Sequence, residues 1–211
     1  MKRLIFLIIT VILLTSTISC SVVTETPEPS PTQPLSTKTP TAEPTPARTA
    51  LETADVIIKA LKAKDMETVA AFVHPQWGLR FTPYPFVRDG DRVFSAQAVP
   101  ALFEDETIYT WGTFDGSGES IEMTFSEYYD RFVYSQDFAT PEVIGLNKEI
   151  GHGNSINNIP KYYPGAEYVE YHFTGFDPQY EGMDWQSLRL VLKQENGIYY
   201  LVGIVHAEWT I

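Results

Sequence analysis

The sequence predicts an α+β domain in which helices come first and a mostly antiparallel sheet follows. Two helical patterns occupy residues 51–73, and the segments after them are rich in Thr, Tyr, Phe and Val, as strands are. Near the end of the chain, Asn196-Gly197 separates two apolar segments and is typical of a hairpin turn. Helices followed by hairpin-joined strands favour an α+β order over alternating βαβ units.

Each predicted helix has a recognisable start. Thr49 and Glu52 have the spacing of a capping box, and Asp65 can cap a second, shorter helix that Pro75 ends. A third helix is predicted over 125–134, preceded by a second capping-box spacing at Thr124 and Glu127. The apolar faces of the first two helices consist of Leu51, Ala54, Ile57, Ile58 and Leu61, then Met66, Val69, Ala70 and Val73.

The strands are predicted from composition and alternation. Two lie before the third helix, at 92–96 and 107–114. The segment 141–164 is rich in Gly, Asn and Pro and is predicted to be a long loop. Three closing strands are predicted at 168–174, 187–194 and 198–209.

The N-terminus indicates export. Lys2 and Arg3 precede a short apolar run, 4–14, which is too short for a membrane span of roughly 20 residues. Cys20 after this run resembles the lipobox of bacterial lipoproteins, although Thr17 stands where leucine is commoner. The expectation is a signal peptide over 1–19, a lipid on Cys20 and an extracytoplasmic position at a membrane. An uncleaved anchor or a plain secreted protein is the alternative.

A Pro/Thr-rich segment separates Cys20 from the domain. Fifteen of the 26 residues in 24–49 are Pro or Thr, so the segment has little to bury and is predicted to be a disordered, extended tether. At about 3.1 Å per residue, its reach is up to roughly 80 Å. The predicted organisation is therefore 1–19 signal, 20–49 lipidated cysteine and tether, and 50–211 one globular domain.

Composition excludes several classes of function. Cys20 is the only cysteine, so the domain has no disulfide, no cysteine zinc site and no thiol nucleophile. The formal net charge of −12 disfavours nucleic acid as a partner. The four histidines have no short metal-ligand spacing, and neither a metal nor another cofactor is expected.

The glycine-rich stretch "WGTFDGSGES" (111–120) is predicted to be a hairpin turn. Its register does not fit a calcium loop, no lysine follows as in a phosphate-binding loop, and Gly116-Ser117-Gly118 lacks the spacing of a hydrolase nucleophile elbow. Asp-Gly and Ser-Gly are common turn formers between strands.

Two segments carry a resemblance to a known fold family. With "LKAKDMETVAAFVHP" near the start and "LVLKQENGIYYLVGIVHAEWT" at the end, the chain resembles NTF2-like (cystatin-related cone) domains. This resemblance implies helices packed into a curved sheet that encloses a pocket. More narrowly, "WGTFDGSGES", "GNSINNI" and "LVGIVHAEWTI" resemble uncharacterised bacterial envelope lipoproteins, which imply no particular activity.

Candidate functional residues follow from this resemblance and from residue type. His172, Tyr129 and Asp130 are the acid/base candidates if the cone holds an enzyme site. His172 lies on a polar row of its strand that either faces solvent, the favoured interpretation, or lines a pocket. The connection 74–86 is expected to form a lid over the mouth of the cone. The candidates for a pocket or its rim are Arg80, Tyr84, Trp111, His152, Asn154 and Asn158.

Three functions remain open at this point. The first is a tethered module that binds a small molecule or an envelope component without catalysis. The second is an NTF2-like enzyme that performs acid/base chemistry, and the third is a purely structural envelope protein. The sequence leaves the ligand, the choice of membrane and the oligomeric state undetermined.

Overall fold

The computed structural model describes residues 48–210. The predicted signal peptide, Cys20 and nearly all of the predicted tether lie outside the described residues. Within residues 48–210, no helix is both long and apolar enough to cross a membrane.

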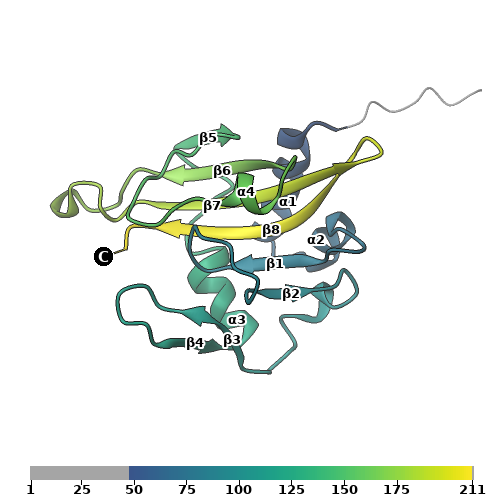
Figure 1. Ribbon diagram of the computed structural model, residues 1–211, viewed down its shortest axis with the longest axis horizontal. Helices are drawn as coiled ribbons and strands as arrows, with labels where there is room; N and C mark the ends of the chain where they lie inside the picture. Colours follow the sequence, from purple (N-terminus) through teal and green to yellow (C-terminus); the bar gives the residue numbers. More distant parts are fainter. Residues whose placement is uncertain (1–47, 211) are drawn as a thin grey trace, which may run out of the picture. The chain divides into compact units, whose positions relative to one another are not determined.

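Six strands form one sheet in the order β2-β1-β8-β7-β6-β5 (Figure 1). Only the β1–β8 pair is parallel, so the predicted α+β class with a mostly antiparallel sheet is confirmed. The bounds are β1 Leu79–Thr82, β2 Arg92–Phe94, β5 Val143–Leu146, β6 Glu167–Phe173, β7 Gln186–Glu195 and β8 Ile198–Glu208.

The sheet is covered on both sides. The helix face, which carries Phe81, Tyr171 and Leu190, packs against the helices and a separate hairpin of two strands. The loop face, which carries Glu170 and Arg189, lies under the chain between β5 and β6. The covering elements are α1 Ala50–Lys62, α2 Met66–Phe72, α3 Phe125–Tyr128 with its π-helical continuation Tyr129–Val133, the hairpin β3 Tyr109–Thr113 and β4 Ser120–Met123, and, on the loop face, α4 Ile159–Tyr162.

Local signals place the helix starts as expected. The Thr49 hydroxyl accepts the Glu52 amide at 3.2 Å, and the Glu52 carboxylate accepts the Thr49 amide at 2.8 Å. A second capping box with the same reciprocal bonds begins α3. Asp65 caps α2 by accepting the Thr68 amide at 3.0 Å. The first turn of each of these three helices is therefore fixed by side chains close to it in sequence.

Both predicted hairpins are confirmed. Asn196 and Gly197 have φ values of +51° and +80°, which suit a two-residue type I′ turn between β7 and β8. The stretch "WGTFDGSGES" carries the end of β3, its turn and the start of β4, paired antiparallel.

Aromatic side chains fill the space between the helices and the sheet. The ring of Trp111 stacks on Tyr128 with centroids 3.9 Å apart, and its indole nitrogen donates to the Met123 carbonyl at 2.9 Å. Phe81 from β1 meets Phe125 from α3 at 5.5 Å. The sheet is uncurled, so the cone that the NTF2-like resemblance implies is not specifically confirmed.

Three predicted segments differ from the structure. Residues 79–82, expected in a lid, form β1 inside the sheet, and the predicted loop 141–164 contains β5 and α4. The third helix, expected as one α-helix to 134, becomes a π-helix after Tyr128. β1, β5 and α4 have four residues each, which is too short for a period of 2.0 or 3.6 to be recognised.

Replacing Phe81 by Ala is expected to lower the free energy of unfolding by about 3–5 kcal/mol. Phe81 is 0% exposed, and its ring lies edge-on to four other aromatic rings, so the change leaves a cavity in the core. Urea unfolding followed by circular dichroism measures this loss. Phe86→Ala is the matched control, because Phe86 is 41% exposed and should cost less than about 1 kcal/mol. Equal losses would contradict the assignment of Phe81 to the core.

Candidate functional site

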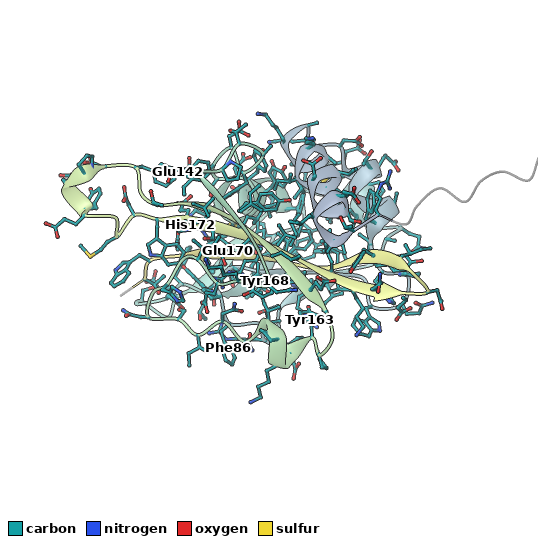
Figure 2. The ribbon with its side chains drawn as sticks, turned by 90° about the horizontal axis from the view of Figure 1, so that it is seen from above. Phe86, Glu142, Tyr163, Tyr168, Glu170 and His172 are labelled. Carbon is teal, nitrogen blue, oxygen red and sulfur yellow. The ribbon has the colours of Figure 1, made fainter. Side chains whose placement is uncertain are left out.

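The polar row of β6 lies on the loop face and is buried. Tyr168, Glu170 and His172 are each at most 5% exposed, so the expectation that this row faces solvent is wrong. Figure 2 shows the three residues following one another along β6, with Tyr163 farther toward α4. The row is covered because residues 149–158, which we call the covering loop, fold back over it. Strand alternation in the sequence does not reveal such a contact.

Glu170 is the centre of a buried polar network. Its carboxylate accepts the amides of Ile150 at 3.2 Å and Gly151 at 2.9 Å. From the neighbouring strand β7, the Ser187 hydroxyl donates to it at 2.7 Å and the Arg189 Nε at 2.9 Å. A fully buried carboxylate is therefore paired with a fully buried guanidinium, and its oxygens accept further hydrogen bonds.

Arg189 ties the covering loop to the sheet a second time. Its Nη2 donates to the Gly151 carbonyl at 3.1 Å and lies 3.4 Å from the Glu149 carboxylate. A Cβ built on Gly151 would overlap the ring of Trp185, so only glycine fits between that ring and the network. The loop is thus held at residues 149–151 by two charged side chains of the sheet.

His172 completes the network but does not form a hydrolytic triad. Its Nδ1 lies 2.8 Å from the Ser187 hydroxyl, which already donates to Glu170, so the ring nitrogen donates to the serine. Ser187 is fully buried and its proton points at a carboxylate rather than at an imidazole base. This arrangement positions side chains and gives no activated nucleophile.

The end of the covering loop is bonded to the segment 84–91, which follows β1. The Asn158 side chain accepts the Val87 amide at 2.7 Å and donates to the Val87 carbonyl at 2.9 Å. This pair of bonds joins α4 to the segment 84–91. It brings Tyr162 of α4 against Arg80 of β1, with the guanidinium carbon 5.3 Å from the ring centroid.

Two adjoining surface hollows of about 310 and 430 Å³ meet at Tyr162, and together we call them the aromatic–cationic hollow. Trp77 borders one and Phe86 the other, and each of these two side chains is more than two-fifths exposed. The lining residues are Trp77, Arg80, Tyr162, Tyr163 and Val202, then Phe86, Val87, Arg88, Asp89, Asn158, Lys161 and again Tyr162.

Two rings of the hollow, those of Trp77 and Tyr162, are in contact with neighbouring side chains. The buried His74 stacks on Trp77 at 4.9 Å, and its Nδ1 accepts the Trp77 amide at 3.1 Å. The Tyr162 hydroxyl donates to the Asp89 carboxylate at 2.7 Å. These contacts orient the rings of Trp77 and Tyr162.

Cations gather around these rings. The Nη1 of Arg80 donates to the carbonyls of Arg88, Asp89 and Asp91 at 2.9–3.3 Å. These bonds fix the position of the guanidinium group. Arg88 and Lys161 line the rim, and the ammonium of Lys193 lies 5.7 Å from the Trp77 ring centroid. Burial raises the pKa of Asp91, although hydrogen bonds from Arg88 and Thr82 oppose the rise. In a chain of net charge −12, this concentration of positive groups is a local exception.

The pocket residues proposed from sequence are divided among several places. Arg80 and Asn158 do line the aromatic–cationic hollow. Tyr84 and Trp111, by contrast, are buried in the core of the helix face. His152 and Asn154 are exposed on the covering loop, where the side-chain amide of Asn154 donates to the Thr210 carbonyl.

The three acid/base candidates do not form one site. His172 belongs to the buried network of the loop face, whereas Tyr129 is buried on the helix face and donates its hydroxyl proton to the Leu61 carbonyl. Asp130 is exposed and pairs with Lys64 at 3.1 Å. Burial raises the pKa of Tyr129 above its ordinary value, which favours the neutral phenol.

A second buried imidazole lies on the helix face. His206 is 3.3 Å from the Glu208 carboxylate, which also pairs with Arg131. Burial lowers the pKa of His206, and although burial opposes ionisation of Glu208, hydrogen bonds from His206 and Arg131 bring its pKa to about 2. Within the described residues, no group of three His, Cys, Asp or Glu side chains is arranged to hold a metal ion.

Sequence reasoning missed the contribution of Lys161 and Tyr162. They lie in the segment predicted as a loop, and only tertiary contacts bring Tyr162 to Arg80 and Lys161 to the segment 86–89. A spacing pattern does not reveal such a contact, because more than 70 residues separate the two segments.

Comparison with known proteins adds little to this geometry. No family model matches the sequence, and no curated protein matches it. One similar solved structure is a DUF4783 family protein from Bacteroides ovatus, with 11% identity over 74% of this chain and 93% of that chain, at a TM-score of 0.26. At that TM-score, the likeness supports no inference about fold or activity.

The stability of the domain is expected to fall as the pH drops below about 6.5. Burial lowers the pKa of His172 and of His206, so between their folded pKa values and 6.5 the unfolded chain binds more protons than the folded one. Urea unfolding at about pH 7.5 and 5.5 measures the difference. His172→Gln should reduce this difference, because one of the two buried imidazoles is then gone.

His152→Gln is the matched control, because His152 is exposed and should leave the difference unchanged. The comparison uses the change in stability between the two pH values, so a constant destabilisation by either substitution cancels. A full pH dependence in His172→Gln would show that His172 does not contribute to it.

Proposed function

We propose that this protein is a membrane-tethered, extracytoplasmic binding module. A signal-like N-terminus, a lipobox-like Cys20 and the Pro/Thr-rich segment 24–49 support the tether. The observation that carries the binding function is the aromatic–cationic hollow, where exposed rings and cations gather on an otherwise acidic chain. Its volume is in the range of small-molecule sites.

The ligand class that fits this hollow is a negatively charged carbohydrate. Flat rings such as Trp77 and Tyr162 offer apolar faces for a sugar ring, with polar atoms at their edges. Arg80, Arg88 and Lys161 supply positive charge for a carboxylate or phosphate group on the sugar. A neutral sugar offers these cations no anionic group, so the hollow should discriminate by charge.

The NTF2-like relationship and an enzyme site within it are the alternative proposal. The helix pair α1–α2 ahead of the sheet supports the relationship. Acid/base chemistry there needs His172, Tyr129 or Asp130 beside an enclosed cavity, whereas these residues lie in three separate environments. The binding module therefore accounts better for the described residues.

Replacing Cys20 by Ala is expected to release the protein from membranes into the soluble extracytoplasmic fraction. The physical reason is that acyl chains on Cys20 would supply the anchoring free energy, about 0.8 kcal/mol per buried CH₂ group. Cell fractionation with immunoblotting measures the distribution. Ser21→Ala is the matched control and should stay with the membrane. Unchanged membrane association of Cys20→Ala would refute the lipid anchor.

Trp77→Ala and Lys161→Glu are each expected to weaken binding of a galacturonic acid oligosaccharide at least about tenfold, or ~1.4 kcal/mol. The first change removes the ring face and the second reverses a charge at the rim. Isothermal titration calorimetry on the full chain measures the affinity, which should also fall as salt is raised.

Trp209→Ala and Lys59→Glu are matched controls, because both side chains are exposed and neither lines the hollow. Neutral oligosaccharides of the same length should bind more weakly than the acidic one. Equal binding of neutral and acidic sugars would contradict the charge argument. A flat response to acidic, phosphorylated and neutral oligosaccharides together would favour a purely structural protein.

A further inference from the structure

The aromatic–cationic hollow has two halves that differ in their chemistry. We call the part of about 310 Å³ that Trp77 and Tyr163 line the Trp77 half. The part of about 430 Å³ that Arg88 and Lys161 line is the Lys161 half. Tyr162 borders both, so a ligand that crosses its ring contacts both halves.

The cations beside the Trp77 half are already bonded to the protein. The Nη1 of Arg80 donates to three backbone carbonyls. Burial raises the pKa of the Asp91 carboxyl, and the nearby charge of Arg80 is one of the groups that oppose this rise. Lys193, close to the Trp77 ring, donates to the Pro164 carbonyl at 2.9 Å. A carboxylate placed here would lose water and gain little in exchange.

The Trp77 half offers a ring face instead. The Trp77 side chain is 47% exposed, and the buried His74 stacks on it at an interplanar angle of 24°. The Nδ1 of His74 accepts the amides of Gln76 and Trp77 at 3.2 and 3.1 Å, so these bonds fix the turn that carries the ring. Tyr163 and Val202 add an apolar wall. A fixed ring face beside such a wall suits the stacking of an uncharged sugar.

The cations of the Lys161 half are exposed at its rim. The guanidinium carbon of Arg88 lies 5.6 Å from the ring centroid of Phe86, and the Lys161 side chain is exposed as well. Among the described residues, neither charged group forms a salt bridge. The Asp89 carboxylate also lines this half, but it accepts the Tyr162 hydroxyl proton at 2.7 Å. Two exposed cations therefore remain for one acidic group of a ligand.

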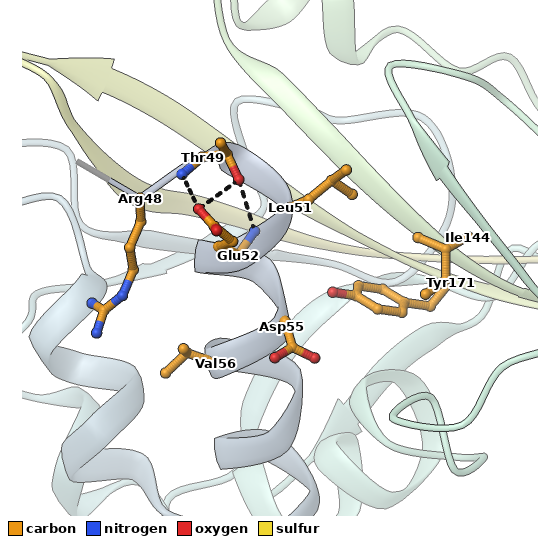
Figure 3. A pocket seen from close by; sticks show the side chains of 8 residues that line it. All are labelled: Arg48, Thr49, Leu51, Glu52, Asp55, Val56, Ile144 and Tyr171. Atoms are coloured by element: carbon orange, nitrogen blue, oxygen red, sulfur yellow. Dashed lines mark hydrogen bonds between the residues drawn. The ribbon is translucent and has the colours of Figure 1, made fainter. Parts of the chain in front are cut away.

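A larger hollow beside α1 lacks this combination (Figure 3). Its volume is about 780 Å³, and the carboxylates of Glu52 and Asp55 line it together with Arg48. The ring that lines it, Tyr171, is only 3% exposed. An acidic ligand would meet more negative than positive side chains there, and it would find little ring face to stack on. Leu51, which also lines this hollow, is therefore a useful control position.

We propose that the ligand of the aromatic–cationic hollow is a polysaccharide in which an uncharged sugar is linked to an acidic one, as in an alternating disaccharide repeat. This inference rests on the proposed binding function and specifies its ligand. The uncharged sugar stacks on Trp77. The acidic sugar next to it directs its carboxylate to Arg88 and Lys161, and the linkage crosses the ring of Tyr162.

Simpler ligands use only part of this surface. A single acidic sugar at the cations leaves the Trp77 ring uncovered, and a neutral oligosaccharide brings no anion. A chain of acidic sugars alone places a second carboxylate in the Trp77 half, where Arg80 and Lys193 are already bonded. The Glu195 carboxylate, 3.1 Å from the Nε2 of His74, lies behind that ring and adds a repulsive charge.

Isothermal titration calorimetry of the full chain with three tetrasaccharides tests the ligand class. The hyaluronan tetrasaccharide alternates glucuronic acid with uncharged N-acetylglucosamine, tetragalacturonic acid is acidic throughout, and chitotetraose is uncharged throughout. The alternating probe should bind at least about tenfold more tightly than either of the other two. It should also bind at least about tenfold more tightly than free glucuronic acid, which fills only the Lys161 half.

Substitutions assign each sugar to its half. Trp77→Ala should weaken the binding of the alternating probe and of chitotetraose, because both stack on the ring. Lys161→Glu should weaken the two acidic probes and leave chitotetraose unchanged, and it should also flatten the salt dependence of the alternating probe. Leu51→Ala is the matched control for Trp77→Ala and should change nothing, since Leu51 lines the larger hollow.

The outcomes separate this inference from the proposed function. If no acidic oligosaccharide binds, or if Trp77→Ala and Lys161→Glu both leave binding unchanged, the binding function itself fails. If both substitutions weaken binding but tetragalacturonic acid binds as tightly as the alternating probe, the hollow is a binding site and the alternating ligand is refuted. Equal affinities for free glucuronic acid and the alternating probe would refute it too, as would a loss of binding in Leu51→Ala.

Discussion

The ion pair between Glu170 and Arg189 is the constraint on which the loop face depends. Two opposite charges are placed on adjacent strands with no exposure to water, so each must be satisfied by the other and by hydrogen bonds. The sheet alone does not supply enough partners. The amides of Ile150 and Gly151 and the carbonyl of Gly151 supply further partners, and Nη1 of Arg189 is left without one among the described residues. The Glu170–Arg189 pair can therefore be buried only when the covering loop is in place.

This constraint extends from the network to the candidate binding surface. Because the covering loop is held at 149–151, Asn158 lies within hydrogen-bond distance of Val87. The helix α4 that follows then lies beside β1. Removal of one partner from a buried pair typically costs about 3–5 kcal/mol, because the other charge is left uncompensated. The position of Tyr162 thus depends indirectly on a salt bridge elsewhere on the same face of the sheet. The core of the helix face is instead held mainly by aromatic packing.

The two faces of the sheet consequently have different physical roles. Packing of Trp111, Phe125 and their neighbours leaves the helix face filled, which is the ordinary source of stability in a domain without disulfides. The loop face holds the polar network and, beside it, the concentration of cations and rings. Electrostatic attraction of an anionic ligand to an acidic protein needs such a local cluster, because the average field of the chain repels it.

The sequence alone determined the features that depend on neighbours in the chain. Capping at Thr49, Asp65 and Thr124 and the Asn196-Gly197 turn were predictable, because a few adjacent residues fix their hydrogen bonds. The α+β class followed from the order of these elements. Only the tertiary structure decided where β1, β5 and α4 lie, since four residues carry too little periodicity. It also decided that His172 is buried and that Arg80 meets Tyr162, because burial depends on segments distant in sequence that fold over the sheet.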